Sequence, residues 1–256
     1  ILAAVAALAL VAGTIPFTSA FAQNQPVPCP DGASCLMTGG PSGDYFRFFA
    51  KPTTENLAKT AWEDLVIATS NGTPDNMKAI AENKNHFGLG QANVAGMLID
   101  TGPYKDKVKI VPTQLIGQEL VFMVVNDALF KRAPFYGTIA SNSANVKFVL
   151  PSETSGPGVT FKQLSELDPR LKNSKSIVRV ESVDDAINAV ANGQAQATLV
   201  LQAANPENPR FKLIKEKGLH IVPVRFQPML NMKMASGQPM FVACGGQEIG
   251  QKEPAN

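Results

Sequence analysis

Two stretches of the chain repeat one helix-then-strand pattern 110 residues apart, and this repetition constrains the fold more than any other feature. "TPDNMKAIAENKN" predicts a helix at 73–85, which Thr73 can cap, and "HFGLGQANV" predicts a strand after it. "SVDDAINAVANGQAQATLVLQAAN" at 182–205 predicts the same order. The aligned pairs are Asp75 with Asp185, Met77 with Ile187, Ile80 with Val190 and Leu89 with Leu199. Two Ala-rich helices share some residues by chance, but the shared order of elements predicts two similar α/β lobes.

A Gly- and Ser-rich turn stands before each of these units. The first, in "TGGPSGDYFRFF" at 38–49, separates a short apolar run from a helical segment at 45–61, which Lys51-Pro52 must interrupt or begin afresh. The second, "LPSETSGPGVT" at 150–160, follows the strand "NVKFV". A plain strand-to-helix turn explains either one alone. Two such turns bring backbone N–H groups to the carboxyl edges of two sheets, where open α/β sheets bind ligands. They therefore predict a cleft that closes about a hinge.

Composition and charge exclude several classes of protein. With 256 residues, 45% of them hydrophobic, the chain is long enough for one large domain or two small lobes. A net charge of +2 and the absence of long Lys or Arg runs argue against a nucleic-acid partner. The sequence has two histidines, no CxxC and no HExxH, so we expect no zinc site. It also lacks a GxSxG elbow, an SxxK and a recognisable nucleophile–base set, so we expect a protein that is not an enzyme.

The first segment predicts export. Residues 1–22 are largely apolar and end in "AFA", a small-x-small cleavage site. A membrane anchor is the alternative, but a spanning helix needs ~20 apolar residues and the uninterrupted run is shorter. We expect a signal peptide at 1–22 and an N-terminal extension at 23–35. In an oxidising compartment Cys29 and Cys35 fit a small disulfide loop, and Cys244 is left as a free or buried thiol.

Two further patterns suggest a metal or a cofactor, but ordinary packing or strand structure explains each of them. Met229, Met232 and Met234 have a spacing used by exported Cu(I) proteins, since thioethers are soft ligands. Methionine is also a common gap-filler in cores, and no His or Cys lies nearby, so we expect no metal. Gly88-x-Gly90 lacks a third glycine and lies in a strand, so it fails as a dinucleotide fingerprint, and no cofactor is expected.

The ordered set of motifs resembles that of the TAXI family, the periplasmic solute receptors of TRAP transporters. Their opening strand, turn and helix typically show Gly-Gly-x-x-Gly-x-Tyr, as does "MTGGPSGDYFRFF" here. "ATSNGTPDNMKAIAENKNHFGLGQANVA" is similar to the second unit of that family, and "LPSETSGPGVT" and "AINAVANGQAQATLVL" to its second lobe. The resemblance covers about 36–224. It implies a two-lobed periplasmic binding protein type 2 fold, in which each lobe is a mostly parallel sheet flanked by helices.

The resemblance also implies a function and a ligand set. The function is a periplasmic receptor that captures a small organic anion, a glutamate-like amino acid or a dicarboxylate, and delivers it to the membrane permease subunits of a TRAP transporter. Carried over position by position, the ligand-binding residues are Gly40, Ser42, Gly43, Tyr45, Ser70, Asn71, Gln91, Asn93, Thr154, Ser155, Gly156 and Gly158. Asn93 stands where an acidic residue is common in the family, and Pro157 donates no N–H in the second turn. Both departures leave the identity of the ligand open.

The same fold implies where the chain crosses between lobes. Lobe one is expected at 36–118 and 205–256, and lobe two at 119–204. TAXI receptors usually continue beyond a polar tail such as "GQPMFVACGGQEIGQKEPAN", so a truncated chain and a disordered last part are both open. Two other functions also remain: a type 2 binding protein of an ABC importer, which a neighbouring permease gene would separate, and an exported α/β enzyme.

Overall fold

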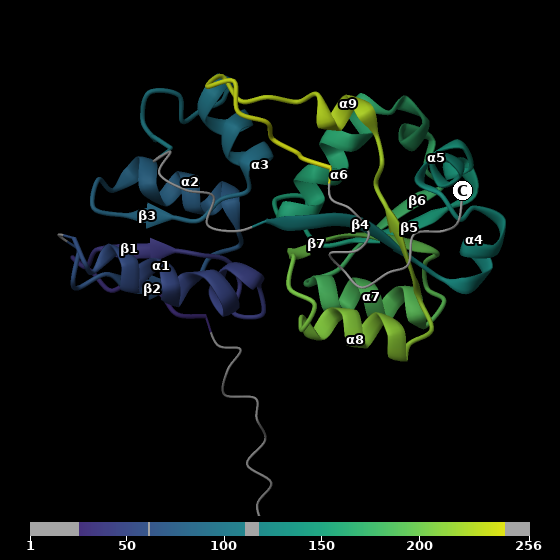
Figure 1. Ribbon diagram of the computed structural model, residues 1–256, viewed down its shortest axis with the longest axis horizontal. Coiled ribbons are helices and arrows are strands. Elements are labelled where there is room, and N and C mark those ends of the chain that lie inside the picture. Colours follow the sequence, from purple (N-terminus) through teal and green to yellow (C-terminus); the bar gives the residue numbers. More distant parts are fainter. Residues whose placement is uncertain (1–25, 61, 111–117, 244–256) are drawn as a thin grey trace, which may run out of the picture.

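The structure is a computed structural model that describes residues 26–60, 62–110 and 118–243, and it consists of two lobes side by side (Figure 1). Each lobe has one sheet at its centre, with helices above and below it. The predicted fold class, two α/β lobes with mostly parallel sheets flanked by helices, is confirmed. The expected signal peptide at 1–22 and Cys244 lie outside the described residues.

Lobe one is built on a small parallel sheet. Its strands, in the order β2-β1-β3, are β1 (Cys35–Met37), β2 (Val66–Ala68) and β3 (Phe87–Gly88). Its helices are the π-helical turn η2 (Tyr45–Phe49), α1 (Ala50–Leu57), α2 (Thr73–Glu82), α3 (Ala92–Gly96) and the π-helical turn η3 (Met97–Thr101). The helical segment expected at 45–61 changes from a π-helix to an α-helix at Ala50, so α1 begins two residues before Pro52, and it ends at Leu57. Gly72 precedes α2 at φ +112°, a conformation that glycine adopts without strain.

Lobe two is built on a larger sheet with the strand order β6-β5-β7-β4-β8. The strands are β4 (Glu119–Val125), β5 (Lys147–Leu150), β6 (Ser176–Arg179), β7 (Ala197–Ala203) and β8 (His220–Pro223). The helices are α4 (Asp127–Arg132), α5 (Tyr136–Ser141), η4 (Ser143–Asn145), α6 (Gly156–Leu167), η5 (Pro169–Asn173), α7 (Val183–Ala191), α8 (Pro209–Glu216) and α9 (Gln227–Leu230). β4, the first strand after lobe one, runs antiparallel to its neighbours β7 and β8, whereas β5 is parallel to β6 and β7.

The two lobes bury very different amounts of apolar side chain. Both faces of the lobe two sheet are packed. Phe148 and Leu199 belong to the cluster between the sheet and α6, and Val200 belongs to the cluster between the sheet and helices α7 and α8. Within its described residues, lobe one has two clusters of three buried residues, which are Leu36, Ala50 and Leu89 in one, and Met77, Ala95 and Val108 in the other. Burial contributes about 25 cal/mol per Å² of apolar surface, so lobe two supplies more of the stability of the molecule.

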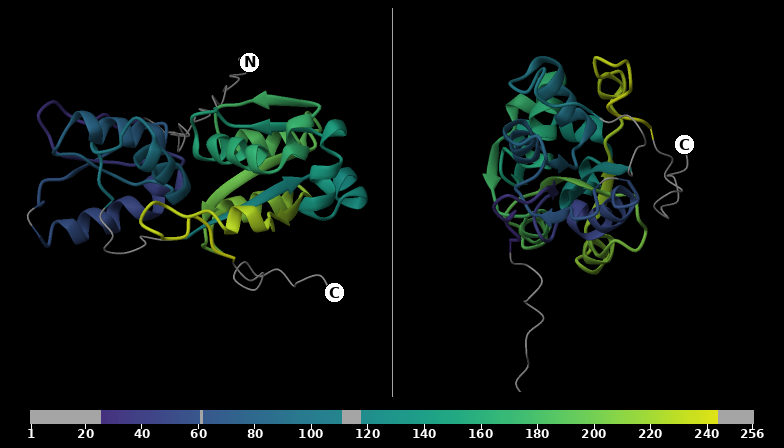
Figure 2. Two further views of the ribbon diagram at one scale, coloured as in Figure 1. Left: turned by 90° about the horizontal axis from the view of Figure 1, so that it is seen from above. Right: turned by 90° about the vertical axis from the view of Figure 1, so that its left-hand side faces the viewer.

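The chain returns to lobe one later than the sequence predicted. Residues from 205 onward were expected in lobe one, but β8 pairs with β4 and is an edge strand of the lobe two sheet. The physical reason is burial, because Val222 of β8 packs in the core of lobe two. The return is made by 231–243, which Figures 1 and 2 show reaching across to lobe one. There Met234 and Met240 pack against Gly96, and the N–H of Ala235 donates to Asp100 Oδ2 at 2.6 Å.

The extension before β1 is tied to lobe one. Cys29 and Cys35 form the predicted disulfide, which closes a loop directly before the first strand. Val27 is held to Thr69, beyond the end of β2, by hydrogen bonds of 2.7 and 2.8 Å. Among the helices of the described residues, none is long and apolar enough to cross a membrane.

Candidate functional site

The segments that follow the parallel strands of lobe one face those of lobe two. Ser42 after β1, Gly72 after β2 and Gln91 after β3 all lie against lobe two. Gly72 and Gln91 lie against Gly156, which is in the first turn of α6 and follows β5. Ser42 contacts Arg210, which is in the first turn of α8 and follows β7. The predicted cleft between two carboxyl sheet edges is therefore the place where the lobes meet, which is the usual ligand position in open α/β sheets.

The first turns of α2 and α6 meet across this cleft. A methyl group on Gly72, which precedes α2, would lie 4.0 Å from the backbone nitrogen of Gly156, which begins α6. The amide of Gln91 packs directly on Gly156, where a side chain would collide with Gln91 Oε1. The first turn of a helix exposes N–H groups without helical partners and carries about half a positive charge. Two positive helix ends from different lobes thus face each other.

Asn93 joins the lobes by side-chain hydrogen bonds. Its amide donates to Thr160 Oγ1 at 3.0 Å and to Gln163 Oε1 at 2.7 Å, both on α6. Gln163 Nε2 donates back to the carbonyl oxygen of Asn93 at 3.4 Å. All three residues are buried, so these hydrogen bonds fix α3 of lobe one against α6 of lobe two.

Ser70 and Asn71 are engaged within lobe one. Ser70 Oγ accepts from the N–H of Gly72 at 3.0 Å and donates to Asn76 Oδ1 at 2.6 Å. Asn76 in turn donates to the carbonyl oxygen of Leu89 at 2.7 Å and to that of Thr38, so it ties together the ends of β1 and β3. The exposed Asn71 donates to Asp75 Oδ2 at 2.7 Å. These bonds order the sheet edge, and a ligand role for Ser70 and Asn71 stays a prediction.

The lobe two turn shapes the start of α6. Ser155 caps the helix, since its hydroxyl accepts from the N–H of Gly158 at 3.2 Å and donates to the carbonyl oxygen of Ser152 at 2.6 Å. Gly158 is required there, because a Cβ would collide with the backbone of Ser152 and Glu153. Thr154 is exposed, and its hydroxyl lies 3.0 Å from that of Ser152.

The first predicted turn contacts lobe two. Gly40 and Gly43 close the turn by an N–H to carbonyl bond of 2.7 Å. The carbonyl oxygen of Ser42 accepts from Arg210 Nη2 at 3.2 Å, and the hydroxyl of Tyr45 donates to Glu119 Oε2 at 2.9 Å. These contacts place the Gly-rich turn at the interface between the lobes.

A buried ionic network, which sequence reasoning missed, lies beside this turn. Arg210 binds Asp44 Oδ1 at 3.1 Å and Asp184 Oδ1 at 2.7 Å, with the side chains of Arg210 and Asp44 only 6% and 3% exposed. Asp44 Oδ2 also accepts from the N–H of Ala203 at 2.5 Å and from Asn208 Nδ2 at 3.2 Å. The sequence offers one signal, "NPR" at 208–210, which predicts a helix start. It does not pair Arg210 with a carboxylate 166 residues away.

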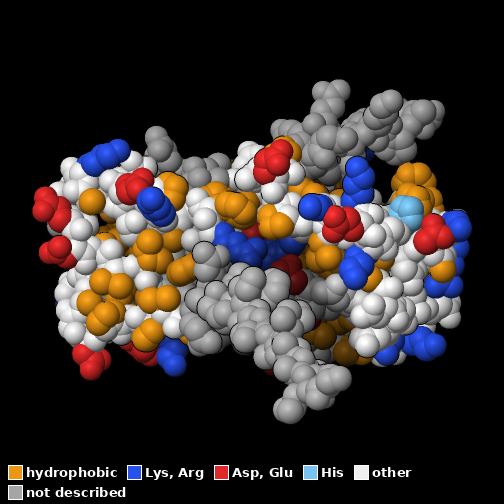
Figure 3. Space-filling view, turned by 90° about the horizontal axis from the view of Figure 1, so that it is seen from below, with side chains coloured by type: hydrophobic (Ala, Val, Ile, Leu, Met, Phe, Trp, Pro, Cys, Tyr) orange, Lys and Arg blue, Asp and Glu red, His pale blue; other side chains and the backbone are white. Residues whose placement is uncertain are grey.

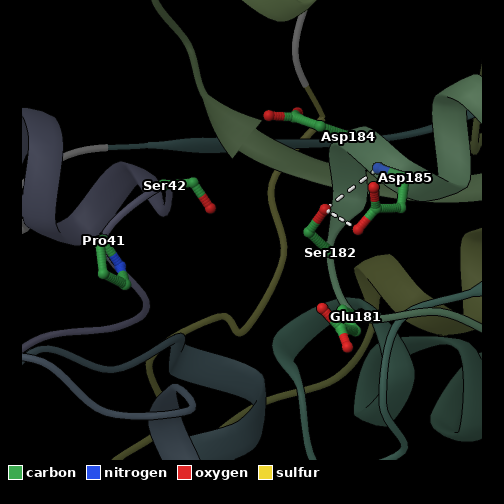
Figure 4. A pocket seen from close by; sticks show the side chains of 6 residues that line it. All are labelled: Pro41, Ser42, Glu181, Ser182, Asp184 and Asp185. Atoms are coloured by element: carbon green, nitrogen blue, oxygen red, sulfur yellow. Dashed lines mark hydrogen bonds between the residues drawn. The ribbon is translucent and has the colours of Figure 1, made fainter. Parts of the chain in front are cut away.

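A cavity of about 360 Å³ opens between the lobes next to this network. Figure 4 shows Pro41 and Ser42 of lobe one on one side, and residues at the start of α7 on the other. The latter are Glu181, Ser182, Asp184 and Asp185. Ser182 caps α7 by accepting from the N–H of Asp185 at 3.1 Å. The cavity volume is at the lower end of the range for small-molecule sites.

The surface between the lobes carries positive charge on one face. Figure 3 shows Lys and Arg side chains gathered in the hollow between lobe one and lobe two. Within the described residues, no group of three or more His, Cys, Asp or Glu side chains is arranged to hold a metal ion.

Comparisons with known proteins show no family model that matches this chain and no curated protein that matches it. Solved structures do resemble it. One is a binding protein component of an ABC phosphonate transporter from Pseudomonas aeruginosa, at 12% identity and a TM-score of 0.49, over 75% of this chain and 65% of that chain. A second is an ancestral arginine-binding protein bound to arginine, at 12% identity and a TM-score of 0.47, over 75% and 79%.

A third similar structure is a ligand-binding core in complex with L-glutamate, at 12% identity and a TM-score of 0.48, over 74% of this chain and 78% of that chain. The chain thus spans about two thirds of the length of the phosphonate-binding protein and more of the other two. At this identity, and with TM-scores below 0.5, these similarities do not assign a ligand or a partner to the chain.

Proposed function

We propose that this protein is an exported solute receptor that captures a small organic anion between its lobes and delivers it to a membrane permease. The observation that carries the proposal is the meeting of the first turns of α2 and α6, which come from different lobes. Two positive helix ends that face each other repel, and an anion between them removes this repulsion.

The energies require donors from both lobes. One helix end favours an anion by about 0.3–1 kcal/mol, or up to about 2 kcal/mol when partly buried. Micromolar affinity needs about 8 kcal/mol, so a single turn is not enough. Hydrogen bonds to a charged ligand contribute about 1.5–3 kcal/mol each. Several donors must therefore converge, which a cleft between two sheet edges allows.

The cavity between the lobes favours an amino acid over a dicarboxylate. Its lobe two side carries Glu181, Asp184 and Asp185. Asp184 is paired with Arg210 and Asp185 is hydrogen-bonded to Ser182, whereas Glu181 is exposed. Carboxylates attract an ammonium group and repel a second carboxylate. A glutamate-like cargo would place its carboxylate at the helix ends and its ammonium group toward this cavity.

The delivery partner is proposed from the sequence. The motifs from "MTGGPSGDYFRFF" to "AINAVANGQAQATLVL" resemble those of TAXI receptors, so the permease is proposed to be of the TRAP type. Because the predicted site residues include no recognisable nucleophile–base set, we propose a binder and not an enzyme. Co-purification with the product of a neighbouring permease gene would test the partner.

Thermal unfolding against a ligand panel tests the receptor. The panel contains L-glutamate, other amino acids, dicarboxylates, sulfonates and phosphonates. A ligand that binds only the folded state stabilises it by RT ln(1 + [L]/Kd), which is about 2.7 kcal/mol at a hundredfold excess over Kd. A rise of several degrees with one carboxylate class supports the proposal. No shift with any member, for a folded protein freed of co-purified solute, overturns it.

A pair of glycine variants locates the binding site. Gly156→Ala places a methyl group between the helix ends, against the amide of Gln91, so we expect a loss of ligand affinity of tenfold or more. Gly137→Ala on α5 is the matched control, because its added methyl group meets nothing within 4 Å. Equal affinities in the two variants would contradict a site between α2 and α6.

A further inference from the structure

We propose that the contact of Asp44 and Tyr45 with lobe two is a proton-operated latch, in which Glu119 takes up one proton as the cleft closes and releases it as the cleft opens. The interlobe latch consists of Asp44, Tyr45, Glu119, Asp184 and Arg210. The inference concerns the closing motion itself, and its consequence for cargo rests on the proposed function.

Two adjacent residues form the lobe one side of the latch. The hydroxyl group of Tyr45 donates a hydrogen bond of 2.9 Å to Oε2 of Glu119, which is the first residue of β4. Asp44 pairs with Arg210 on α8 and also accepts from the N–H of Ala203 at the end of β7. Opening of the cleft separates all of these groups, because their partners lie on the other lobe.

The charges of the latch are unbalanced. Three carboxyl groups face one guanidinium, and Arg210 makes its direct ion pairs with Asp44 and Asp184. Glu119 faces the neutral hydroxyl of Tyr45, with Asp44 and Arg210 as its charged neighbours. Glu119 is half-buried, and a carboxylate that is partly withdrawn from water beside another carboxylate is costly unless it binds a proton.

The ionisation of Glu119 follows from this setting. Burial is the largest cause and, with the repulsion of Asp44, it raises the pKa of Glu119 to about 7, against the smaller lowering effects of the Tyr45 hydroxyl and Arg210. In the open form Glu119 meets water, and its pKa returns toward the ordinary value of 4.5.

The direction of the pH effect is then fixed. Between pH 4.5 and about 7 the closed form holds a proton that the open form lacks, so closure is favoured as the pH falls. The closing equilibrium changes by up to about tenfold per pH unit in this window. It is flat above about pH 7 and below about pH 4.5. If closure captures the cargo, the apparent affinity for the cargo follows the same curve.

The distance between spin labels on the two lobes measures closure directly, without any ligand. Exposed Lys59 and Lys212 are replaced by cysteine in a Cys244→Ser background, and the distance distribution is recorded by pulsed EPR from pH 5 to pH 8. We expect the ratio of closed to open molecules to fall as the pH rises and to level off near pH 7. A ratio that is constant from pH 5 to pH 8 overturns the latch.

Three variants assign the proton. Glu119→Gln has no titratable group at position 119, so its ratio of closed to open molecules is expected to lose the pH dependence. Tyr45→Phe removes a hydroxyl that lowers the pKa of Glu119, so the curve is expected to move to higher pH. Glu216→Gln, an exposed change on α8, is the matched control and is expected to keep the wild-type curve. A pH dependence that survives in Glu119→Gln overturns the assignment.

An NMR titration provides an independent measurement. In protein with ¹³C-labelled glutamate carboxyl groups, the signal that is missing from Glu119→Gln is expected to titrate near pH 7. A midpoint near 4.5 overturns the proposal. Because neither measurement contains cargo, the latch can fail while the ligand panel succeeds, and the panel can fail while the latch is confirmed.

Discussion

Lobe one and lobe two begin from the same strand, turn and helix order, but they differ in what holds them together. Lobe two packs both faces of five strands with large buried side chains. The described part of lobe one has three short strands and two clusters of three buried residues. A lobe with so small a core depends on contacts from outside its sheet. Those contacts are the disulfide, the returning segment 231–243, and the ion pair with Arg210.

This difference suits a protein that opens and closes. Lobe two can serve as the rigid half. The contacts between lobe one and lobe two then decide whether the open or the closed arrangement is more stable. The molecule also offers a probe for one lobe alone, because its single tryptophan, Trp62, packs edge-on against Phe87 of β3 with ring centroids 4.7 Å apart. Trp62 fluorescence reports on lobe one, whereas the far-ultraviolet circular dichroism signal reports on both lobes.

The variant with the largest expected effect, Arg210→Met, tests how far the stability of lobe one depends on Arg210. Arg210→Met leaves the buried carboxylate of Asp44 without its cation, so we expect a loss of about 3–5 kcal/mol in urea unfolding followed by Trp62. Lys212→Met, an exposed change on the same helix, is the control and should stay within about 0.5 kcal/mol. A loss below about 1 kcal/mol for Arg210→Met would show that lobe one stands without this contact.

Matched core variants test whether the lobes unfold separately. Leu199→Ala and Leu36→Ala each remove a buried leucine, at a cost of about 2–5 kcal/mol where each is packed. We expect Leu199→Ala to move the Trp62 and circular dichroism transitions together, because lobe one relies on lobe two. Leu36→Ala is expected to move the Trp62 transition ahead of the other. Coincident transitions in both variants would contradict separate unfolding of the lobes, since the molecule would then be one cooperative unit.

Reduction of the Cys29–Cys35 disulfide should weaken lobe one alone. The bond closes a loop with a sequence separation of six, for which chain entropy gives about 2 kcal/mol. We expect the Trp62 transition to shift to lower urea in the presence of a reductant. Amide hydrogen exchange in β5 and β7 should not change. Faster exchange in those lobe two strands would show that the disulfide supports more than its own lobe.

The smallest expected effect concerns the helix end at the cleft. Ser155→Ala removes the hydroxyl that caps α6, so we expect a loss of about 1 kcal/mol in thermal unfolding. Thr154→Ala, at the exposed neighbouring position, should cost less than about 0.5 kcal/mol. Equal losses would mean that the turn, and not the cap, positions the start of α6.

The elements could be predicted where a local pattern decides them. Pro74 lies in the first turn of α2, Ser155 and Pro157 begin α6, and the repeated helix and strand of lobe two appear as α7 and β7. The expected cap by Thr73 was wrong, because Gly72 is the N-cap of α2 and the Thr73 hydroxyl instead accepts from the N–H of Gln91. The strand expected at 86–94 is only Phe87–Gly88, because the chain turns into α3 directly after Gln91. The sequence also indicated the disulfide, because the two cysteines flank a turn sequence. The lobe of β8 was missed, since an apolar strand can join either sheet and only the burial of Val222 selects one.

The site was predicted less completely, for a physical reason. The turns and strand ends that were singled out do meet between the lobes, as Gln91 and Gly156 show. Their hydrogen-bond partners could not be read from the sequence, because Asn93 bonds to Thr160 and Asp44 to Arg210 over long separations. Charged side chains on separate helices carry no periodic signal of their pairing, so the latch was visible only in three dimensions.

Amide hydrogen exchange with and without cargo is the most direct test of a solute clamped between two helix ends. The measurement uses the carboxylate that gives the largest shift of the unfolding midpoint, and it follows the first turns of α2 and α6. We expect cargo to slow exchange in both turns together, because both donate to one anion. Slower exchange in one lobe with no change in the other would contradict it.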